Sequence, residues 1–276
     1  MRSHFSTLSK YFPFFILVVS FSAGSIVGSA RTHFSFSQTT SSSPVASILS
    51  ASENWGLSFQ EEGKRPVGNA TIQELAEYHA FFAADTAEKK LYLTFDCGYE
   101  NGNTPAILAA LKKHQAPAVF FAVGNFVRDN PDLIKQMVAE GHIVGNHTVN
   151  HKSMPTLSEE QINSEVMDLH KSIYEKFGYE MKYIRPPMGE FSEKSISVTN
   201  SLGYKTVMWS FAYKDWEEKN QPSEQEAIKI IVNNFHSGEI MLLHGNSKTN
   251  TNILKEIINQ AKNQEYTFAS LDEYEE

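Results

Sequence analysis

Short apolar runs alternate with amphipathic segments from about Trp55 to the end of the chain. Runs rich in β-branched and aromatic side chains predict strands, and these are 91–95, 118–123, 142–146, 183–187, 205–209, 239–244 and 266–271. Between them, apolar residues recur three or four positions apart, which predicts helices, and these are 104–115, 130–141, 158–178, 193–203, 223–235 and 252–262. This alternation is typical of a mostly parallel sheet covered by helices.

The predicted helix at 158–178 carries signals at both ends. Ser158 and Gln161 have the spacing of a capping box, and Gly178 follows the last apolar position. In the helix predicted at 130–141, Pro131 lies near the start and Gly141 at the end, the asymmetry that helix termini favour. We therefore expect well-defined helices at both places.

The number of strand–helix units favours a closed arrangement of the sheet. About seven such units in a single domain suit a distorted (β/α)7–8 barrel. An open, doubly wound α/β sheet remains the alternative.

The first residues have the pattern of an export signal. Arg2 and Lys10 precede a long apolar run that ends in small residues at 28–30. We expect 1–30 to be a signal peptide or an N-terminal anchor, 31–54 a Ser/Thr-rich spacer, and 55–276 the single globular domain. The protein would then act outside the cell, in the wall or at the outer face of the cytoplasmic membrane.

Composition narrows the range of partners. The chain has 276 residues, 24 basic and 32 acidic, and a formal net charge of −8. No basic footprint for nucleic acid is present, and we expect a monomer. The one cysteine excludes an intramolecular disulfide.

Chemically active side chains follow the predicted strands. Each lies at or just beyond a strand's carboxyl end: Asp96 with Cys97, His147 with His151, Arg185, Asp215 with Trp216, and His244. In a parallel barrel those ends share one face, where active sites lie. This clustering predicts an enzyme.

Two of these histidines have a spacing that suits a metal site. His147 and His151 are four residues apart, which on a helical turn places both rings on one face. A catalytic zinc usually has three protein ligands, and the Cys97 thiolate could be the third. Two solvated histidines and a buried core cysteine are the alternatives. A cysteine nucleophile is disfavoured, because the adjacent Asp96 would raise the pKa of the thiol.

Five segments, "TFDCGYENG", "HTVNH", "RPPMG", "KDW" and "LLH", occur in the order of the motifs of polysaccharide deacetylases. The chain resembles this family (NodB homology, carbohydrate esterase family four) from about Trp55 to Leu271. The segments "GYENG", "NWGL" and "TFASLDE" resemble the delta-lactam-biosynthetic, peptidoglycan-specific branch most.

The resemblance implies a role for each matching residue. Asp96 would be the catalytic base and His244 the general acid, with Arg185 holding the base and Asp215 tuning the histidine. His147 and His151 would bind a divalent metal, which we expect to be zinc. The expected substrate pocket consists of Trp216, Leu242, Tyr99 and Pro187.

Cys97 is where this sequence departs from the family pattern, because most members have a second aspartate there as a metal ligand. A thiolate in its place would favour zinc-like ions. The implied activity is hydrolysis of the N-acetyl groups of N-acetylmuramic acid in peptidoglycan, of the cortex type made during sporulation. Alternatives are deacetylation of N-acetylglucosamine in peptidoglycan or a chitin-like polymer, and an exported glycan-binding protein with a decayed metal site. A glycoside hydrolase is a further alternative, with a carboxylate pair drawn from Asp96, Glu100, Asp215 and Glu190.

Overall fold

A computed structural model describes residues 53–274, so the predicted export signal and most of the predicted spacer lie outside the described residues. A curled parallel sheet forms the centre, with strands in the order β11-β5-β6-β7-β8-β10-β4 and β12 paired to β5. Its members are β4 (Ala80–Phe81), β5 (Lys90–Cys97), β6 (Ala118–Ala122), β7 (Ile143–Asn146), β8 (Tyr183–Ile184), β10 (Lys205–Val207), β11 (Glu239–His244) and β12 (Thr267–Phe268).

The two ends of this strand order approach each other. Isolated bridges link Phe211 to Met241 and Ala83 to Glu239, so the segments that follow β10 and β4 reach β11. The sheet therefore curls into the distorted barrel that the sequence predicts, and the open doubly wound alternative is wrong.

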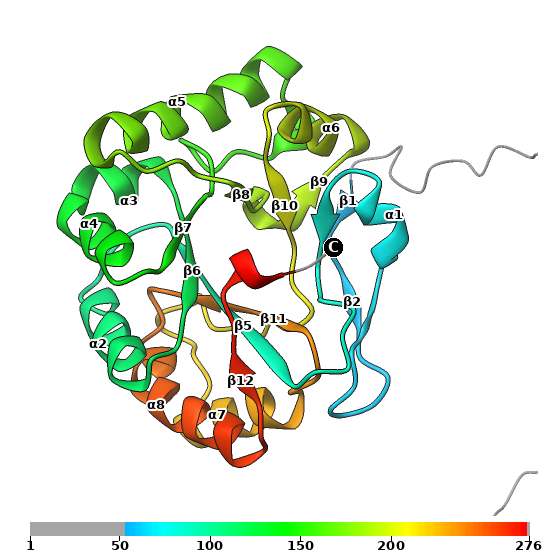
Figure 1. Ribbon diagram of the computed structural model, residues 1–276, viewed down its shortest axis with the longest axis vertical. Coiled ribbons are helices and arrows are strands. Elements are labelled where there is room, and N and C mark those ends of the chain that lie inside the picture. The colour runs from blue at the N-terminus through cyan, green and yellow to red at the C-terminus, as the bar shows by residue number, and fades with distance from the viewer. Residues whose placement is uncertain (1–52, 275–276) are drawn as a thin grey trace, which may run out of the picture. The chain divides into compact units, whose positions relative to one another are not determined.

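Helices surround the strands (Figure 1). They are α2 (Thr104–His114), α3 (Gly124–Asp129), α4 (Pro131–Ala139), α5 (Glu159–Phe177), α6 (Glu193–Ser201), α7 (Glu224–Asn233) and α8 (Lys248–Asn263). The expected capping box of α5 is present, with Ser158 accepting from the N–H of Gln161, and Gly178 ends the helix at φ +63°. Within residues 53–274, no helix has the length and apolar character needed to cross a membrane.

Several elements were not predicted. Short segments precede β5, namely β1 (Glu53–Asn54), β2 (Leu57–Ser58), β3 (Val67–Gly68) and α1 (Ile72–Ala76). β1 forms an antiparallel pair with β9 (Glu190–Phe191), which lies far from it in the sequence. Within residues 53–274 there are also 3₁₀ turns at η2 (Met154–Thr156), η3 (Pro187–Gly189) and η4 (Leu271–Glu273). The strands β1, β2 and β3 have only two residues each and lie outside any longer apolar run, so no periodic pattern marks them.

Strand β5 is buried on both faces, and its two faces have different surroundings. Leu93, Phe95 and Cys97 pack in the large apolar cluster between the sheet and the helices. Tyr92 packs in a second cluster inside the barrel. Because side chains alternate along a strand, Thr94 and Asp96 share the interior face with Tyr92.

Candidate active site

A cavity of about 1340 Å³ opens at the carboxyl ends of the strands. Seven of the residues predicted for the site line it: Asp96, Tyr99, His147, His151, Trp216, Leu242 and His244. Arg185 and Asp215 lie just behind this lining and are fully buried. The predicted clustering of chemical groups at one barrel face is therefore present, as expected for this architecture.

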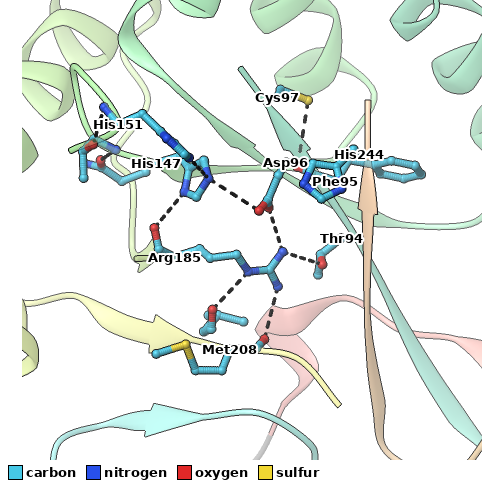
Figure 2. A network of polar contacts seen from close by, with 12 residues as sticks. Thr94, Phe95, Asp96, Cys97, His147, His151, Arg185, Met208 and His244 are labelled. Carbon is cyan, nitrogen blue, oxygen red and sulfur yellow. Dashed lines mark hydrogen bonds and ion pairs between the residues drawn. The ribbon is translucent and has the colours of Figure 1, made fainter. Parts of the chain in front are cut away.

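The innermost carboxylate of the cavity is held by a buried arginine. Arg185 follows β8 and donates from Nη1 to Asp96 Oδ1 at 2.8 Å. The same Nη1 donates to Thr94 Oγ1 at 2.8 Å, while Nε and Nη2 donate to the carbonyls of Val207 and Met208 (Figure 2). Arg185 thus joins the ends of three strands, and its position is fixed by hydrogen bonds on every side.

The guanidinium also has an aromatic support. Its carbon lies 4.3 Å from the centre of the Phe121 ring, a cation–π distance. Phe121 is paired in register with both Asp96 and Gly145, on the two neighbouring strands. A Cβ on Gly145 would lie 2.4 Å from Phe121 Cδ1, so only glycine leaves room for the ring there.

The pKa of Asp96 is lowered by its surroundings. Burial alone would raise it, but the positive charge of Arg185 and the neighbouring His147 and His244 lower it by more. The carboxylate is therefore ionised at neutral pH and exposes its second oxygen to the cavity side, where His147 Nε2 lies 3.5 Å from Oδ2.

A second carboxylate orients His244. Asp215 Oδ1 accepts from His244 Nδ1 at 2.7 Å, and Oδ2 accepts the backbone N–H of His244 at 2.8 Å and the amide of Asn250. Burial alone would lower the pKa of His244, but the hydrogen bond and charge of Asp215 raise it by more. With Nδ1 bound to Asp215, Nε2 is the nitrogen left for substrate.

His147 and His151 face each other across the cavity floor. Their Nε2 atoms are 3.2 Å apart, although the two residues lie in a loop after β7 and not on the helical turn that the spacing suggested. Positive φ angles at Thr148 and His151, +66° and +53°, shape this loop. Burial lowers the pKa of His147 to about 4 and also lowers that of His151, so both rings are neutral at pH 7.

The histidine pair has the chemistry of a metal ligand pair. His147 Nδ1 lies 2.8 Å from the carbonyl of Arg185, which fixes the proton on Nδ1 and leaves a lone pair on Nε2. Two nitrogens that ligate one tetrahedral zinc lie roughly 3.3 Å apart, given bonds of about 2.0–2.1 Å. The distance between the two Nε2 atoms therefore suits two ligands of one zinc ion. Within residues 53–274, no third His, Cys, Asp or Glu side chain completes a three-ligand group.

The hypothesis that Cys97 is the third ligand is wrong. Cys97 is the last residue of β5, and its side chain points to the helix side, opposite to Asp96 (Figure 2). It is 1% exposed and does not line the cavity. Burial, together with Asp96 and Glu100, raises the pKa of the thiol well above its usual range. Cys97 is therefore an ordinary core cysteine, as the alternative interpretation holds.

One pocket residue was also predicted wrongly. Pro187 is buried and does not line the cavity, whereas its neighbours Met188 and Gly189 do. Met188 has φ +59° inside the 3₁₀ turn, which turns its side chain outward where it is exposed. The lining also includes residues that no sequence pattern indicates, among them Val123, Gly124, Asn125, Val149, Asn150, Trp209, Tyr213 and Asn246.

The carboxylates proposed for glycoside hydrolysis do not form a pair. Of the four candidates, only Asp96 lines the cavity. Asp215 is buried behind His244, and Glu100 Oε1 accepts backbone N–H groups of Gly102 and Thr104. Glycoside hydrolysis needs two carboxylates on either side of the scissile bond, and these four side chains do not provide such a pair.

Comparison with known proteins identifies the family. The model of the polysaccharide deacetylase family matches residues 83–207. The chain is 42% identical over 222 residues to the peptidoglycan-N-acetylmuramic acid deacetylase PdaA of Bacillus subtilis, covering 80% of this chain and 84% of that protein. It is 35% identical to a peptidoglycan-N-acetylglucosamine deacetylase of Bacillus cereus over 67% of this chain and 88% of the relative.

The fold agrees with this relationship. The solved structure of Bacillus subtilis PdaA, a family 4 carbohydrate esterase, superimposes with a TM-score of 0.77 at 41% identity, covering 81% of this chain and 96% of that one. The chain therefore belongs to the polysaccharide deacetylase family, the hydrolases of carbohydrate esterase family 4.

Proposed function

We propose that the protein removes N-acetyl groups from N-acetylmuramic acid in peptidoglycan. The observation that carries this proposal is the pairing of Asp96 with His244 on neighbouring strands, each held by its own charged partner and both open to one cavity. The level of identity to PdaA supports the choice of sugar.

Asp96 acts as the general base. Its lowered pKa keeps it ionised, and the hydrogen bond from Arg185 leaves Oδ2 free to take a proton from the attacking water. Arg185 stays positively charged beside Asp96 when Asp96 takes up the proton. Three other hydrogen bonds keep the guanidinium in place during the reaction.

His244 acts as the general acid. Its Nε2 gives a proton to the nitrogen of the departing sugar amine, because an unprotonated amine is a poor leaving group. Asp215 stabilises the charged imidazole before the transfer and keeps the ring oriented, as a buried carboxylate does for the histidine of a catalytic triad.

His147 and His151 would hold a divalent ion, which we take to be zinc because both donors are neutral imidazoles. When bound, such an ion polarises the acetamide carbonyl and offsets the negative charge that develops on its oxygen. Leu242 and Trp216 line the cavity together with His244, and the ring centres of Trp216 and His244 are 5.6 Å apart. The apolar Leu242 suits the acetyl group, and the Trp216 ring suits a sugar face.

The product would be acetate and a muramic acid with a free amine. That amine lies on the same sugar as the lactyl carboxyl group, so the two can close a lactam ring in a later step. This chemistry supports a role in delta-lactam formation of the spore-cortex type. N-Acetylglucosamine of peptidoglycan or of a chitin-like polymer is the second candidate substrate, because a relative at 35% identity is named for it.

Mass spectrometry of peptidoglycan treated with the enzyme and then digested to muropeptides tests the proposal. Loss of one acetyl mass from muramic acid is the expected result, and loss from glucosamine alone would select the second candidate. Glycan binding without acetate release, with zinc, cobalt or manganese added, would instead favour a non-catalytic glycan-binding protein.

We also propose that the protein is exported and acts in the wall or at the outer membrane face. The sequence from Arg2 to Ala30 supports this. N-terminal sequencing of material from the cell envelope and the medium tests it. A mature start near Arg31 indicates a cleaved signal, an intact Met1 in the membrane fraction indicates an anchor, and material confined to the cytoplasm contradicts export.

A further inference from the structure

Three loops at the rim of the cavity are joined by polar contacts that involve none of the proposed catalytic groups. They are the β5–α2, β10–α7 and β11–α8 loops. Glu218, in the β10–α7 loop, accepts two hydrogen bonds on Oε1 from the β5–α2 loop: the Tyr99 hydroxyl donates at 2.5 Å and the Asn101 amide at 2.8 Å. Glu218 therefore ties the first of these loops to the second.

Asn246 joins the third loop to the other two. Its carbonyl accepts from the side-chain amides of Asn101 and Asn103 at 2.8 and 2.9 Å. Its own side-chain amide donates to the carbonyl of Trp216 at 3.2 Å. The loops that follow β5, β10 and β11 thus form one continuous polar network, which we call the rim network (Tyr99, Asn101, Asn103, Trp216, Glu218 and Asn246).

The rim network includes two residues with exposed aromatic side chains, Tyr99 held through its hydroxyl and Trp216 through its backbone carbonyl. Tyr99 is 47% exposed and Trp216 49% exposed, and both line the cavity. A large exposed ring beside a cavity marks a binding surface more often than a packing residue. Trp216 also contacts the ring of His244. The Tyr99 hydroxyl instead bonds to Glu218 and Asn246, so the position of its ring depends on the rim network.

We propose that Glu218 is a positioning residue that holds the Tyr99 ring against the sugar next to the one that is deacetylated. This inference rests on the proposed function for the nature of the ligand. The cavity volume of about 1340 Å³ exceeds the roughly 300–1000 Å³ typical of single small-molecule sites, which leaves room for a neighbouring saccharide. Fixing an aromatic ring before binding lowers the entropy lost on binding.

Glu218 acts through its acceptor oxygen and not through its charge. A single oxygen receives both donors, and glutamine offers the same carbonyl oxygen without the negative charge. Glu218 is exposed and contributes nothing to the buried core, so its replacement leaves the fold intact. Its neighbour Glu217 is also exposed and bonds only within its own loop, to Lys214 and Asn220, and makes a matched control.

The experiment measures binding of a peptide-free, fully N-acetylated glucosamine–muramic acid tetrasaccharide by calorimetry. Each variant is made in the His244→Ala background, so that the saccharide is not consumed. We expect Glu218→Ala to weaken binding roughly three- to tenfold, the range of one lost hydrogen-bonded contact. Glu218→Gln and Glu217→Ala should bind within about twofold of the parent. Tyr99→Ala should lose at least as much as Glu218→Ala, and the double variant no more than Tyr99→Ala alone, because the two residues act as a unit.

In the active background, the loss from Glu218→Ala should appear as a raised KM for acetate release with kcat nearly unchanged. Any of three results overturns the inference: unchanged binding in Glu218→Ala, equal losses in Glu218→Ala and Glu218→Gln, or additive losses in the double variant. A parent that does not bind the tetrasaccharide overturns it as well. Failure of the proposed function would look different, since the binding pattern would hold while no variant released acetate.

Discussion

His244 and Asp96 occupy directly paired positions on the neighbouring parallel strands β11 and β5, so their side chains leave the sheet on the same side. The pKa of His244 is raised, chiefly by Asp215, and the pKa of Asp96 is lowered, chiefly by Arg185. Burial alone would shift each pKa in the opposite direction. Opposite pKa shifts of two adjacent groups suit the proposed roles of His244 as acid and Asp96 as base.

Removing the ionisable group of either member of this pair should slow turnover strongly. We expect Asp96→Asn and His244→Ala each to lower kcat for acetate release by roughly a hundredfold or more, the usual scale for general acid–base groups. Asp132→Asn, on the outer helix α4, is the matched control and should retain full activity. Near wild-type turnover in either site variant would contradict the assigned role.

The Asp215→Asn variant should shift the alkaline side of the pH–rate profile. His244 must be protonated to act as an acid, so activity falls as pH rises through its pKa. Asp215 raises that pKa, and its neutral replacement should lower it. The descending limb of kcat/KM should therefore move to lower pH, which initial rates between about pH 5 and 10 would reveal. A limb that stays in place would show that another group is the acid.

Replacing Arg185 should affect both stability and the acid side of the profile. In Arg185→Met, burial acts on Asp96 without a counter-charge, so the pKa of the carboxyl rises. Asp96 must be ionised to act as the base, and the ascending limb should therefore move to higher pH. The unpaired carboxylate should also lower the free energy of unfolding by about 3–5 kcal/mol in urea titrations.

Arg65→Met is the control for that change. The Arg65–Asp85 ion pair is at the surface, and its loss should alter stability by at most about 1 kcal/mol. Equal effects of the two arginine substitutions would contradict the special role of the buried one.

Metal binding should depend on the histidine pair. We expect His147→Ala and His151→Ala each to weaken zinc binding in calorimetric titrations at least tenfold, because each removes one of two facing nitrogens. His114→Ala, at the end of α2 and outside the cavity lining, should titrate like the wild type. Undiminished zinc affinity in both site variants would place the ion elsewhere.

Changes at Cys97 should affect stability and not metal affinity. Cys97→Ala should bind zinc as the wild type does, since the sulfur lies on the helix side of β5. Cys97→Asp would bury a carboxylate in an apolar cluster and should destabilise the fold by several kcal/mol, instead of restoring a ligand. In the native protein the thiol should resist aromatic disulfide reagents and react only on unfolding. Loss of zinc binding in a folded Cys97→Ala protein would revive the ligand hypothesis.

Most of the fold could be read from periodicity. The long elements, such as β5, β11 and α5, are where the apolar pattern predicts them, because a full strand or several helical turns give a repeated signal. The two-residue strands β1 to β4 could not be found this way. One predicted helix near 130–141 is preceded by a separate short helix, α3, which the pattern did not reveal.

The site was partly predictable for the same reason. Groups at strand ends meet on one barrel face, which brought Asp96, Arg185 and His244 together as expected. The orientation of Cys97 could have been inferred too, since adjacent strand residues point to opposite faces. The loop that places His151 opposite His147 depends on positive φ angles, which spacing does not encode. Contacts between distant loops, as at Glu218, have no local signal.

Gly145 carries no functional group and does not line the cavity, yet the chemistry depends on it. The ring of Phe121 occupies the space where a Cβ of residue 145 would lie, and the guanidinium of Arg185 rests on that ring. The guanidinium in turn holds the charge of Asp96. A single methyl group at position 145 would displace the ring and with it the support of the cation. The ionisation of Asp96, the proposed base, is therefore sensitive to a volume change two strands away, in a residue that has neither charge nor dipole in its side chain.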